Sequence, residues 1–171
     1  TEIQALLAAM RDAGARLAVL EVSSHALAQD RVAGMRFQVA GFTNLTRDHL
    51  DFHGDMERYF AAKRRLFAEH LAPDGLAVVN VKDAFGARLA DQLGPGRRLW
   101  RFGGRTDDAL RAEDVSSGLG GIAATFVTPA GRFEVRSPLV GAHNLENLLC
   151  AAGIALGLGL PVEAVARGLT G

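Results

Sequence analysis

The chain has 171 residues, of which 49% are hydrophobic and 22% are charged, with nineteen basic residues against nineteen acidic ones. This length fits one ordinary domain, and the apolar fraction excludes a disordered chain, which could not offset its conformational entropy. The net charge of zero argues against a nucleic-acid partner, because binding a polyanion needs excess Lys and Arg. One cysteine excludes an internal disulfide and fits a reducing cytoplasm. No apolar run approaches the ~20 residues that span a bilayer, so no membrane insertion is expected.

The first hundred residues show the pattern of helices alternating with buried strands. Ile3, Leu6, Leu7 and Met10 recur at three- and four-residue intervals, which predicts a helix with one buried face. Continuous apolar runs favour strands that are covered on both faces of a parallel sheet, and they occupy residues 17–22, 37–42, 76–79 and 99–102. A long helix is predicted between the second and third of these runs, over residues 55–71.

A different pattern follows residue 102. Three short runs, at 110–115, 122–127 and 132–135, are separated by turn residues and have no helix between them, which predicts an antiparallel meander. Helices are predicted through residues 147–152 and from Pro161 onward. The predicted fold class is α/β, a doubly wound, mostly parallel sheet flanked by helices (1–102), with a small antiparallel β meander appended (103–137) and C-terminal helices (138–171).

Two polar clusters follow predicted strands, where ligands bind in open α/β sheets. Glu21 ends the first apolar run, although an acid there also fits a strand that simply enters a loop. His49, Asp51 and His53 follow the second run, and imidazole and carboxylate groups are common metal ligands. Their spacing matches no zinc pattern, so a solvated polar loop is the alternative. Asp55 is placed to cap the next helix.

Lys63 is the most informative position. It continues the apolar stripe of the helix predicted over 55–71, whereas Arg64 and Arg65 fall to the side. The ordinary interpretation is that its aliphatic stem packs and its ammonium reaches water. The functional alternative is a desolvated lysine whose lowered pKa leaves a neutral, reactive amine.

A last cluster begins the helix after the meander. Asn144 and Asn147 are three residues apart, so both can project from one side of the first turn. Helix N-termini attract phosphate through their free amide donors. One Asn capping the helix while the other is solvated is the alternative.

Several segments together resemble the Mur ligases, over nearly the whole chain: Glu21–His25, Gln29-x-Arg31, Thr43–Gly54, Tyr59–Lys63 and Gly141–Asn147. The resemblance is strongest to the branch of that family that adds the third residue of the peptidoglycan stem peptide to UDP-N-acetylmuramoyl-L-alanyl-D-glutamate. Enzymes of this family use ATP to phosphorylate a carboxylate, and an amine then attacks the acyl phosphate to form an amide. His143 stands where an aromatic residue is expected in this branch.

The resemblance implies roles for single residues. Glu21 matches the acidic ligand of one Mg²⁺, and His49 matches a ligand of the second. Lys63 matches the lysine that carbon dioxide carbamylates, so that a carboxylate replaces a cation and supplies oxygen donors for the second Mg²⁺. We therefore expect His49 and Lys63 to be catalytic. Contacts to the UDP-N-acetylmuramoyl dipeptide are implied for Ser23, Gln29 and Arg31, and contacts to the adenine of ATP for Asn144 and Asn147.

Two features of the family are missing from this sequence. It contains no Gly-rich phosphate loop ending in Gly-Lys-Thr, and no domain that would select the incoming amino acid, diaminopimelate or lysine. We therefore expect most of a central ATPase domain without the N-terminal UDP-binding domain, the phosphate loop or the C-terminal domain, and we expect it not to catalyse ligation by itself. The full protein is expected in the bacterial cytoplasm.

Three other functions are compatible with these residues. A folylpolyglutamate synthase shares the ATP machinery of the superfamily but not the residues that bind the dipeptide. A metal-dependent hydrolase could be built on His49, Asp51 and His53. A non-catalytic binding module is the third.

Overall fold

A computed structural model describes residues 2–170, which form two units. Unit 1 combines residues 2–36 with 47–70, and unit 2 combines residues 37–46 with 71–170. Each unit is described by itself. No helix among the described residues is long and apolar enough to cross a membrane.

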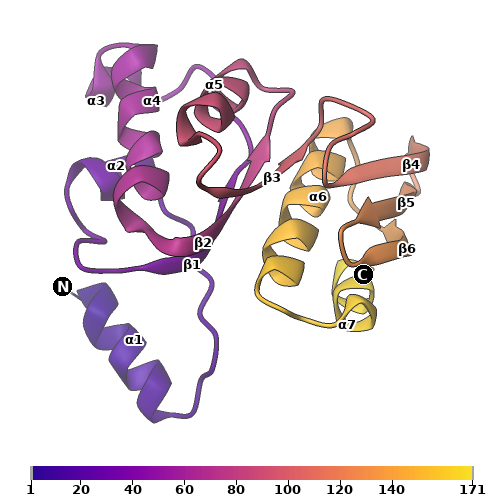
Figure 1. The fold of residues 1–171 in the computed structure, drawn as a ribbon, viewed down its shortest axis with the longest axis horizontal. Coiled ribbons are helices and arrows are strands. Elements are labelled where there is room, and N and C mark those ends of the chain that lie inside the picture. The colour runs from indigo at the N-terminus through magenta and orange to yellow at the C-terminus, as the bar shows by residue number, and fades with distance from the viewer. Residues whose placement is uncertain (1, 171) are drawn as a thin grey trace. The chain divides into compact units, whose positions relative to one another are not determined.

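Unit 1 is helical. Its elements are α1 (Glu2–Asp12), α2 (Ser24–Ala28), α3 (Leu50–His53), α4 (Met56–Arg65) and a π-helical turn, η1 (Leu66–His70). Figure 1 shows α3 folded against the first turn of α4. The side chain of Asp55 accepts a hydrogen bond from the Arg58 amide at 2.8 Å, which confirms the predicted cap of α4. The helix predicted over 55–71 is confirmed as α4 followed by η1.

The helix predicted at the start of the chain is confirmed as α1, but its predicted buried face is wrong in this structure. None of the residues of α1 is buried, and Leu6 is 60% exposed. Helical spacing of apolar residues reports a stripe on the helix, whereas burial also needs an opposing surface. Gln4 provides a polar contact instead, because its Nε2 donates to the Ala33 carbonyl at 2.9 Å.

The strand predicted over residues 17–22 is also wrong. Residues 15–23 have no regular secondary structure, and Val19 is 75% exposed. A strand needs a neighbour to accept and donate its backbone hydrogen bonds, and no described residue pairs with this segment. Apolar continuity predicts which segments suit a strand, but it does not supply the partner.

Unit 2 contains the predicted parallel sheet. Its strands are β1 (Phe37–Phe42), β2 (Leu71–Asn80) and β3 (Arg98–Phe102), hydrogen-bonded in the order β1-β2-β3. The register between β1 and β2 shifts from Phe37–Leu71 to Val39–Leu76. The extra residues of β2 in this irregularity include the predicted turn residues 73–75.

Helices cover both faces of this sheet. They are α5 (Ala84–Leu93) and α6 (Ala142–Gly157). A Cβ on Gly86 of α5 would meet Phe42, whereas a Cβ on Gly41 would lie 2.8 Å from Cys150 Sγ of α6. Successive residues of a strand point to opposite faces, so α5 and α6 lie on opposite sides. The doubly wound arrangement is therefore confirmed.

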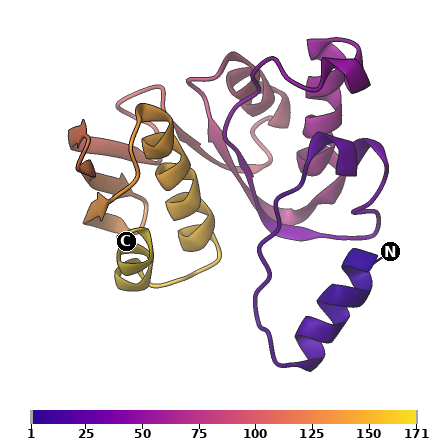
Figure 2. The ribbon, with the colours of Figure 1, turned by 180° about the vertical axis from the view of Figure 1, so that it is seen from behind.

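The predicted meander is the second sheet of unit 2, with strands β4 (Arg111–Gly118), β5 (Gly121–Thr128) and β6 (Gly131–Ser137) in antiparallel order. Figures 1 and 2 show α6 between the two sheets, with α7 (Val162–Leu169) beside β6. One apolar core runs from β2 through α6 to β5, and Phe102, Phe126 and Val78 within it are wholly buried.

Candidate functional site

A cluster of aromatic and imidazole rings gathers in unit 1 around α2, α3 and the start of α4. The ring of His25 lies 4.9 Å from that of His49, 5.5 Å from that of His53 and 4.3 Å from that of Phe52, between ring centres. The ring of Tyr59 lies 4.9 Å from that of His53 and 5.9 Å from that of His49. The structure thus brings His25 next to the histidine loop, although the sequence analysis described the two segments as separate clusters.

His49 is held in a backbone conformation that few non-glycine residues adopt. Its φ is 54° and its ψ 24°, in the left-handed region, immediately before α3. Asp48 supports this turn, because its Oδ1 accepts the His49 amide hydrogen at 2.7 Å. Left-handed backbone costs an L-residue about 1–2 kcal/mol. The rest of the fold must offset this cost to keep the predicted ligand His49 in its place.

His53 is buried, and one of its ring nitrogens has a hydrogen-bonding partner. Its Nε2 lies within hydrogen-bonding distance, 2.9 Å, of the buried Ser24 Oγ. Burial lowers the pKa of His53, and the neighbouring His25 and His49 lower it further, against a smaller opposing effect of Asp51. A neutral imidazole is therefore favoured at this position. His53 acts here as a hydrogen-bonded core residue.

Lys63 lies where its helical position predicts, half-buried on α4, one turn after Tyr59. Its Nζ lies 5.8 Å from the centre of the Tyr59 ring. Burial and the nearby Asp48 raise the pKa of Tyr59, so its hydroxyl stays protonated, and a hydrogen bond to Ser24 opposes that shift. The structure therefore brings His49 and Lys63, two predicted metal ligands, to one ring.

The prediction for the neighbours of Lys63 holds for Arg64, which is exposed, but not for Arg65. The guanidinium of Arg65 donates to the Leu27 carbonyl at 2.6 Å, to Asp30 at 2.7 Å and to Glu69 at 3.0 Å. These bonds raise the pKa of Arg65 and lower that of Glu69. Arg65 ties α2 and η1 to α4.

Glu21, the third predicted metal ligand, does not join the other two. It is exposed in the irregular segment 15–23 and has no hydrogen bond or ion pair among residues 2–170. Within the same described range, no group of three or more His, Cys, Asp and Glu side chains could hold a metal ion. The chemistry of His49 and Lys63 fits a shared Mg²⁺ site only if Lys63 carries oxygen donors. The hydrolase alternative loses its basis, because His53 is bonded to Ser24 and does not form a metal set with His49 and Asp51.

The residues predicted to contact the dipeptide surround α2. The Ser23 Oγ caps this helix by accepting the Ala26 amide hydrogen at 3.1 Å, and Gln29 follows its last residue. Gln29 and Arg31 are exposed. Local structure thus explains Ser23, while the polar ends of Gln29 and Arg31 face solvent.

In unit 2, the predicted adenine contacts occupy the first turns of α6 as expected. Asn144 Nδ2 donates to the Val140 carbonyl at 2.9 Å, and Asn147 Nδ2 donates to Asn144 Oδ1 at 3.3 Å. Both side chains therefore project from one side, and neither caps the helix, whose N-cap is Gly141 without a side-chain bond.

A polar network that the sequence did not predict fixes the same turn of α6. Glu146 accepts from the buried Asn80 Nδ2 at 2.9 Å and from Lys82 Nζ at 2.6 Å. Asn80 is the last residue of β2. The start of α6 is thus joined to the carboxyl end of a parallel strand.

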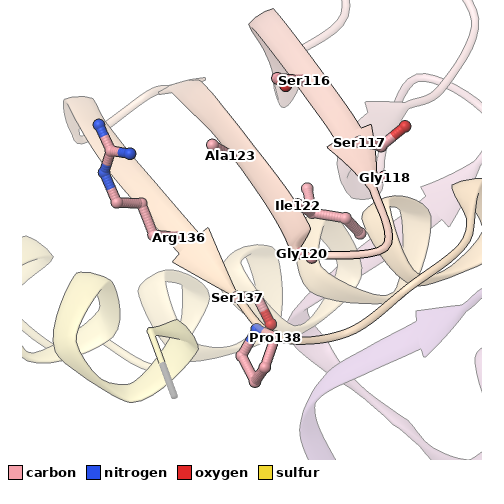
Figure 3. Close-up of a pocket in the computed structure, with 10 residues that line it drawn as sticks. Ser116, Ser117, Gly118, Gly120, Ile122, Ala123, Arg136, Ser137 and Pro138 are labelled. Atoms are coloured by element: carbon pink, nitrogen blue, oxygen red, sulfur yellow. The ribbon is translucent and has the colours of Figure 1, made fainter.

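Two hollows in unit 2 contain none of the predicted site residues. One of about 550 Å³ lies beside Lys82, Gly103, Leu145 and Glu146. The other, of about 530 Å³, lies on the antiparallel sheet and is shown in Figure 3. Its lining includes Ser116 and Arg136, and the Arg136 guanidinium extends away from the β4–β5 hairpin end.

Comparison with known proteins identifies the family. Residues 1–155 match the family model of the Mur ligase middle domain. Because the match covers most of the chain, this protein belongs to the Mur ligase middle-domain family.

Individual relatives show which Mur ligases this chain is similar to. The chain is 51% identical over 170 residues, 99% of its length, to the UDP-N-acetylmuramoyl-L-alanyl-D-glutamate–2,6-diaminopimelate ligase of Gloeobacter violaceus. It is 47% identical to the protein of the same name from Geobacter sulfurreducens. A solved structure of a ligase with this name superposes with a TM-score of 0.86 at 33% identity, over 98% of this chain and 35% of that one.

More distant structures share the architecture. MurF from Acinetobacter baumannii superposes with a TM-score of 0.69 at 29% identity, over 77% of this chain and 28% of that one. An FPGS–AMPPCP complex reaches 0.64 at 17% identity, over 81% of this chain and 35% of that one, which shows a common fold alone. This chain spans about a third of the curated relatives that it matches, 34% in both cases above.

Proposed function

We propose that this chain is the ATP-binding middle domain of an amide ligase that adds the third residue of the peptidoglycan stem peptide to UDP-N-acetylmuramoyl-L-alanyl-D-glutamate. The observation that carries the proposal is the 51% identity over 99% of the chain with a ligase of that description. The relatives are named for 2,6-diaminopimelate, so this is the amino acid to test first, with L-lysine as the alternative. The bacterial cytoplasm remains the predicted location.

The proposed roles divide between the two units. In unit 2, Asn144 and Asn147 contact the adenine of ATP from α6. In unit 1, Glu21 binds one Mg²⁺, while His49 and a carbamate formed from Lys63 and carbon dioxide bind the second. The UDP-N-acetylmuramoyl dipeptide is contacted by Ser23, Gln29 and Arg31.

The contact that His49 and Lys63 each make with one ring supports this assignment. Both groups lie near 6 Å from the centre of the Tyr59 ring, at 5.9 and 5.8 Å. Bound Mg²⁺ would neutralise charge on the transferring phosphoryl group. Lys63 is half-buried on α4 and follows Tyr59 by four residues.

The test uses the protein encoded by the complete gene that contains this chain. Phosphate release should require ATP, the UDP-linked dipeptide and the amino acid together, and a folate should not replace the dipeptide. Lys63→Ala should abolish most turnover, and added acetate should restore part of it by supplying the missing carboxylate. The matched control is Arg64→Ala, one residue along on the exposed side of α4, which should stay close to wild type.

Two outcomes would contradict the proposal. One is near-normal turnover of Lys63→Ala, which cannot form the carbamate. The other is amide formation by the 171-residue chain alone, because its sequence contains no phosphate loop to hold ATP.

A further inference from the structure

Tyr59 occupies the centre of the ring cluster, although the sequence singled it out only as a member of the apolar stripe. It is 6% exposed and comes from the first turn of α4. The ring of Tyr59 contacts those of His49 and His53, and it also faces the Lys63 ammonium.

The two functional candidates reach this ring from different segments. Lys63 follows Tyr59 by four residues on α4, so the two side chains lie on the same helical face. His49 comes from the loop before α3, and its ring meets the Tyr59 ring edge-on, with 75° between the planes. Both side chains therefore contact one rigid ring, which limits where each of them can lie.

The orientation of Tyr59 is itself fixed by its stacked neighbour. Its ring stacks on that of His53 with 11° between the planes. His53 is held in turn, because its Nε2 lies 2.9 Å from the Ser24 Oγ. Ser24 belongs to α2 and His53 to α3, and both are buried, so three helices determine the position of one ring.

We propose that Tyr59 is a positioning residue that holds the His49 imidazole and the Lys63 side chain at a fixed separation, with Ser24 and His53 fixing its ring. The role in catalysis rests on the proposed function, but the positioning itself does not. If Tyr59 were only a packing residue, any buried aromatic of α4 would matter equally. Phe60 provides that comparison, because it is adjacent on α4 and 2% exposed.

The sequence makes a direct test possible, because the chain contains only two lysines, Lys63 and Lys82. Each variant of the 171-residue chain is treated briefly with trinitrobenzenesulfonate, and the labelling of the two lysines is compared by peptide mass spectrometry. Lys82 belongs to unit 2 and serves as the internal reference. Tyr59→Leu should raise the Lys63-to-Lys82 ratio severalfold, because the amine is no longer held over the ring. Tyr59→Phe, which keeps the ring, should restore the ratio toward wild type.

The control variant is Phe60→Leu, which removes a buried aromatic of the same helix and should leave the ratio unchanged. Equal ratios in Tyr59→Leu and Phe60→Leu would overturn the proposal, and so would a Tyr59→Phe variant that behaves like Tyr59→Leu. If Tyr59→Leu fails to fold, His53→Leu removes the stacking partner and should raise the ratio in its place. An unchanged ratio in folded His53→Leu would also overturn the proposal.

A second readout uses the protein from the complete gene. Tyr59→Leu should lower kcat by about 10- to 100-fold, the cost of displacing reacting groups by about an ångström, while KM for ATP stays near wild type. Phe60→Leu should change neither constant appreciably below its unfolding temperature. A wild-type protein without ligase activity would contradict the proposed function, yet the labelling ratio would still decide the positioning role.

Discussion

Unit 2 is built around one continuous apolar core, whereas in unit 1 charged groups and rings join the helices alongside buried apolar side chains such as Leu27 and Phe67. The unit 2 core runs without interruption across two sheets and α6, and it includes Phe102 and Phe126. In unit 1, the contacts between helices include the Arg65 guanidinium and the ring cluster around Tyr59. Apolar burial involves no charge, so it depends little on pH and on charge screening by salt, whereas ionic contacts respond to both. The predicted reactive residues His49 and Lys63 therefore lie in the unit with the more adjustable interactions.

The largest expected effect tests the apolar unit. Phe126→Ala should reduce the free energy of unfolding by about 3–5 kcal/mol, because it removes a wholly buried ring and leaves a cavity. The fluorescence of Trp100, the single tryptophan, reports on β3 of unit 2 during urea unfolding. Leu119→Ala is the control, since Leu119 is 99% exposed and should change stability by less than about 0.5 kcal/mol. Similar losses in the two variants would contradict an apolar core as the source of stability.

A smaller effect is expected in the polar unit. Arg65→Met should destabilise the packing of α2 against α4 by about 1–2 kcal/mol, because three charge-assisted hydrogen bonds are lost from a partly exposed side chain. Faster hydrogen exchange of the amides of α2 and α4 should reveal it. The difference from wild type should shrink in high salt, and Arg64→Met should exchange like wild type. A salt-independent difference would show that the aliphatic stem of Arg65, and not its charge, is responsible.

The smallest effect concerns acid. The hydrogen bond from Arg65 lowers the pKa of Glu69 below its usual value of 4.5. A depressed pKa contributes stability that is present above pH 4.5 and is lost as the pH falls through the folded pKa. Between pH 5 and pH 3, the opening free energy of the amides in α4 and η1, obtained from hydrogen exchange corrected for the intrinsic rate, should therefore fall more in wild type than in Glu69→Gln, by less than about 1 kcal/mol. Identical pH dependence in the two proteins would place the acid-sensitive group elsewhere.

The sequence predicted the regular parts of unit 2 because their signals are local. Apolar composition and flanking turn residues predict β1, β3 and the three strands of the meander from each segment alone. The same reasoning wrongly predicted a strand over residues 17–22, because a strand also needs a neighbouring segment with which to form backbone hydrogen bonds. The sequence analysis did not predict the helices α2 and α5, and it assigned the π-helical turn η1 to an ordinary α-helix.

The sequence predicted which residues belong to the candidate site, but not how they are arranged. Periodicity placed Lys63 on the stripe of α4, and the strand-end rule drew attention to His49. Neither could show that the loop before α3 brings His49 to the ring of Tyr59, because that contact depends on a left-handed turn. The four-residue spacing of Tyr59 and Lys63 was the signal available for the central ring.

The single cysteine offers a practical advantage. Cys150 lies within α6 against β1, and burial raises the pKa of its thiol to about 12. Thiolate is the reactive form, so Cys150 should not react with maleimides at neutral pH as long as α6 stays packed. A cysteine introduced at Leu119, the fully exposed tip of the β4–β5 hairpin, would then be the one site to accept a fluorophore. Spectroscopic probes can therefore be attached to the native protein without first removing its own thiol.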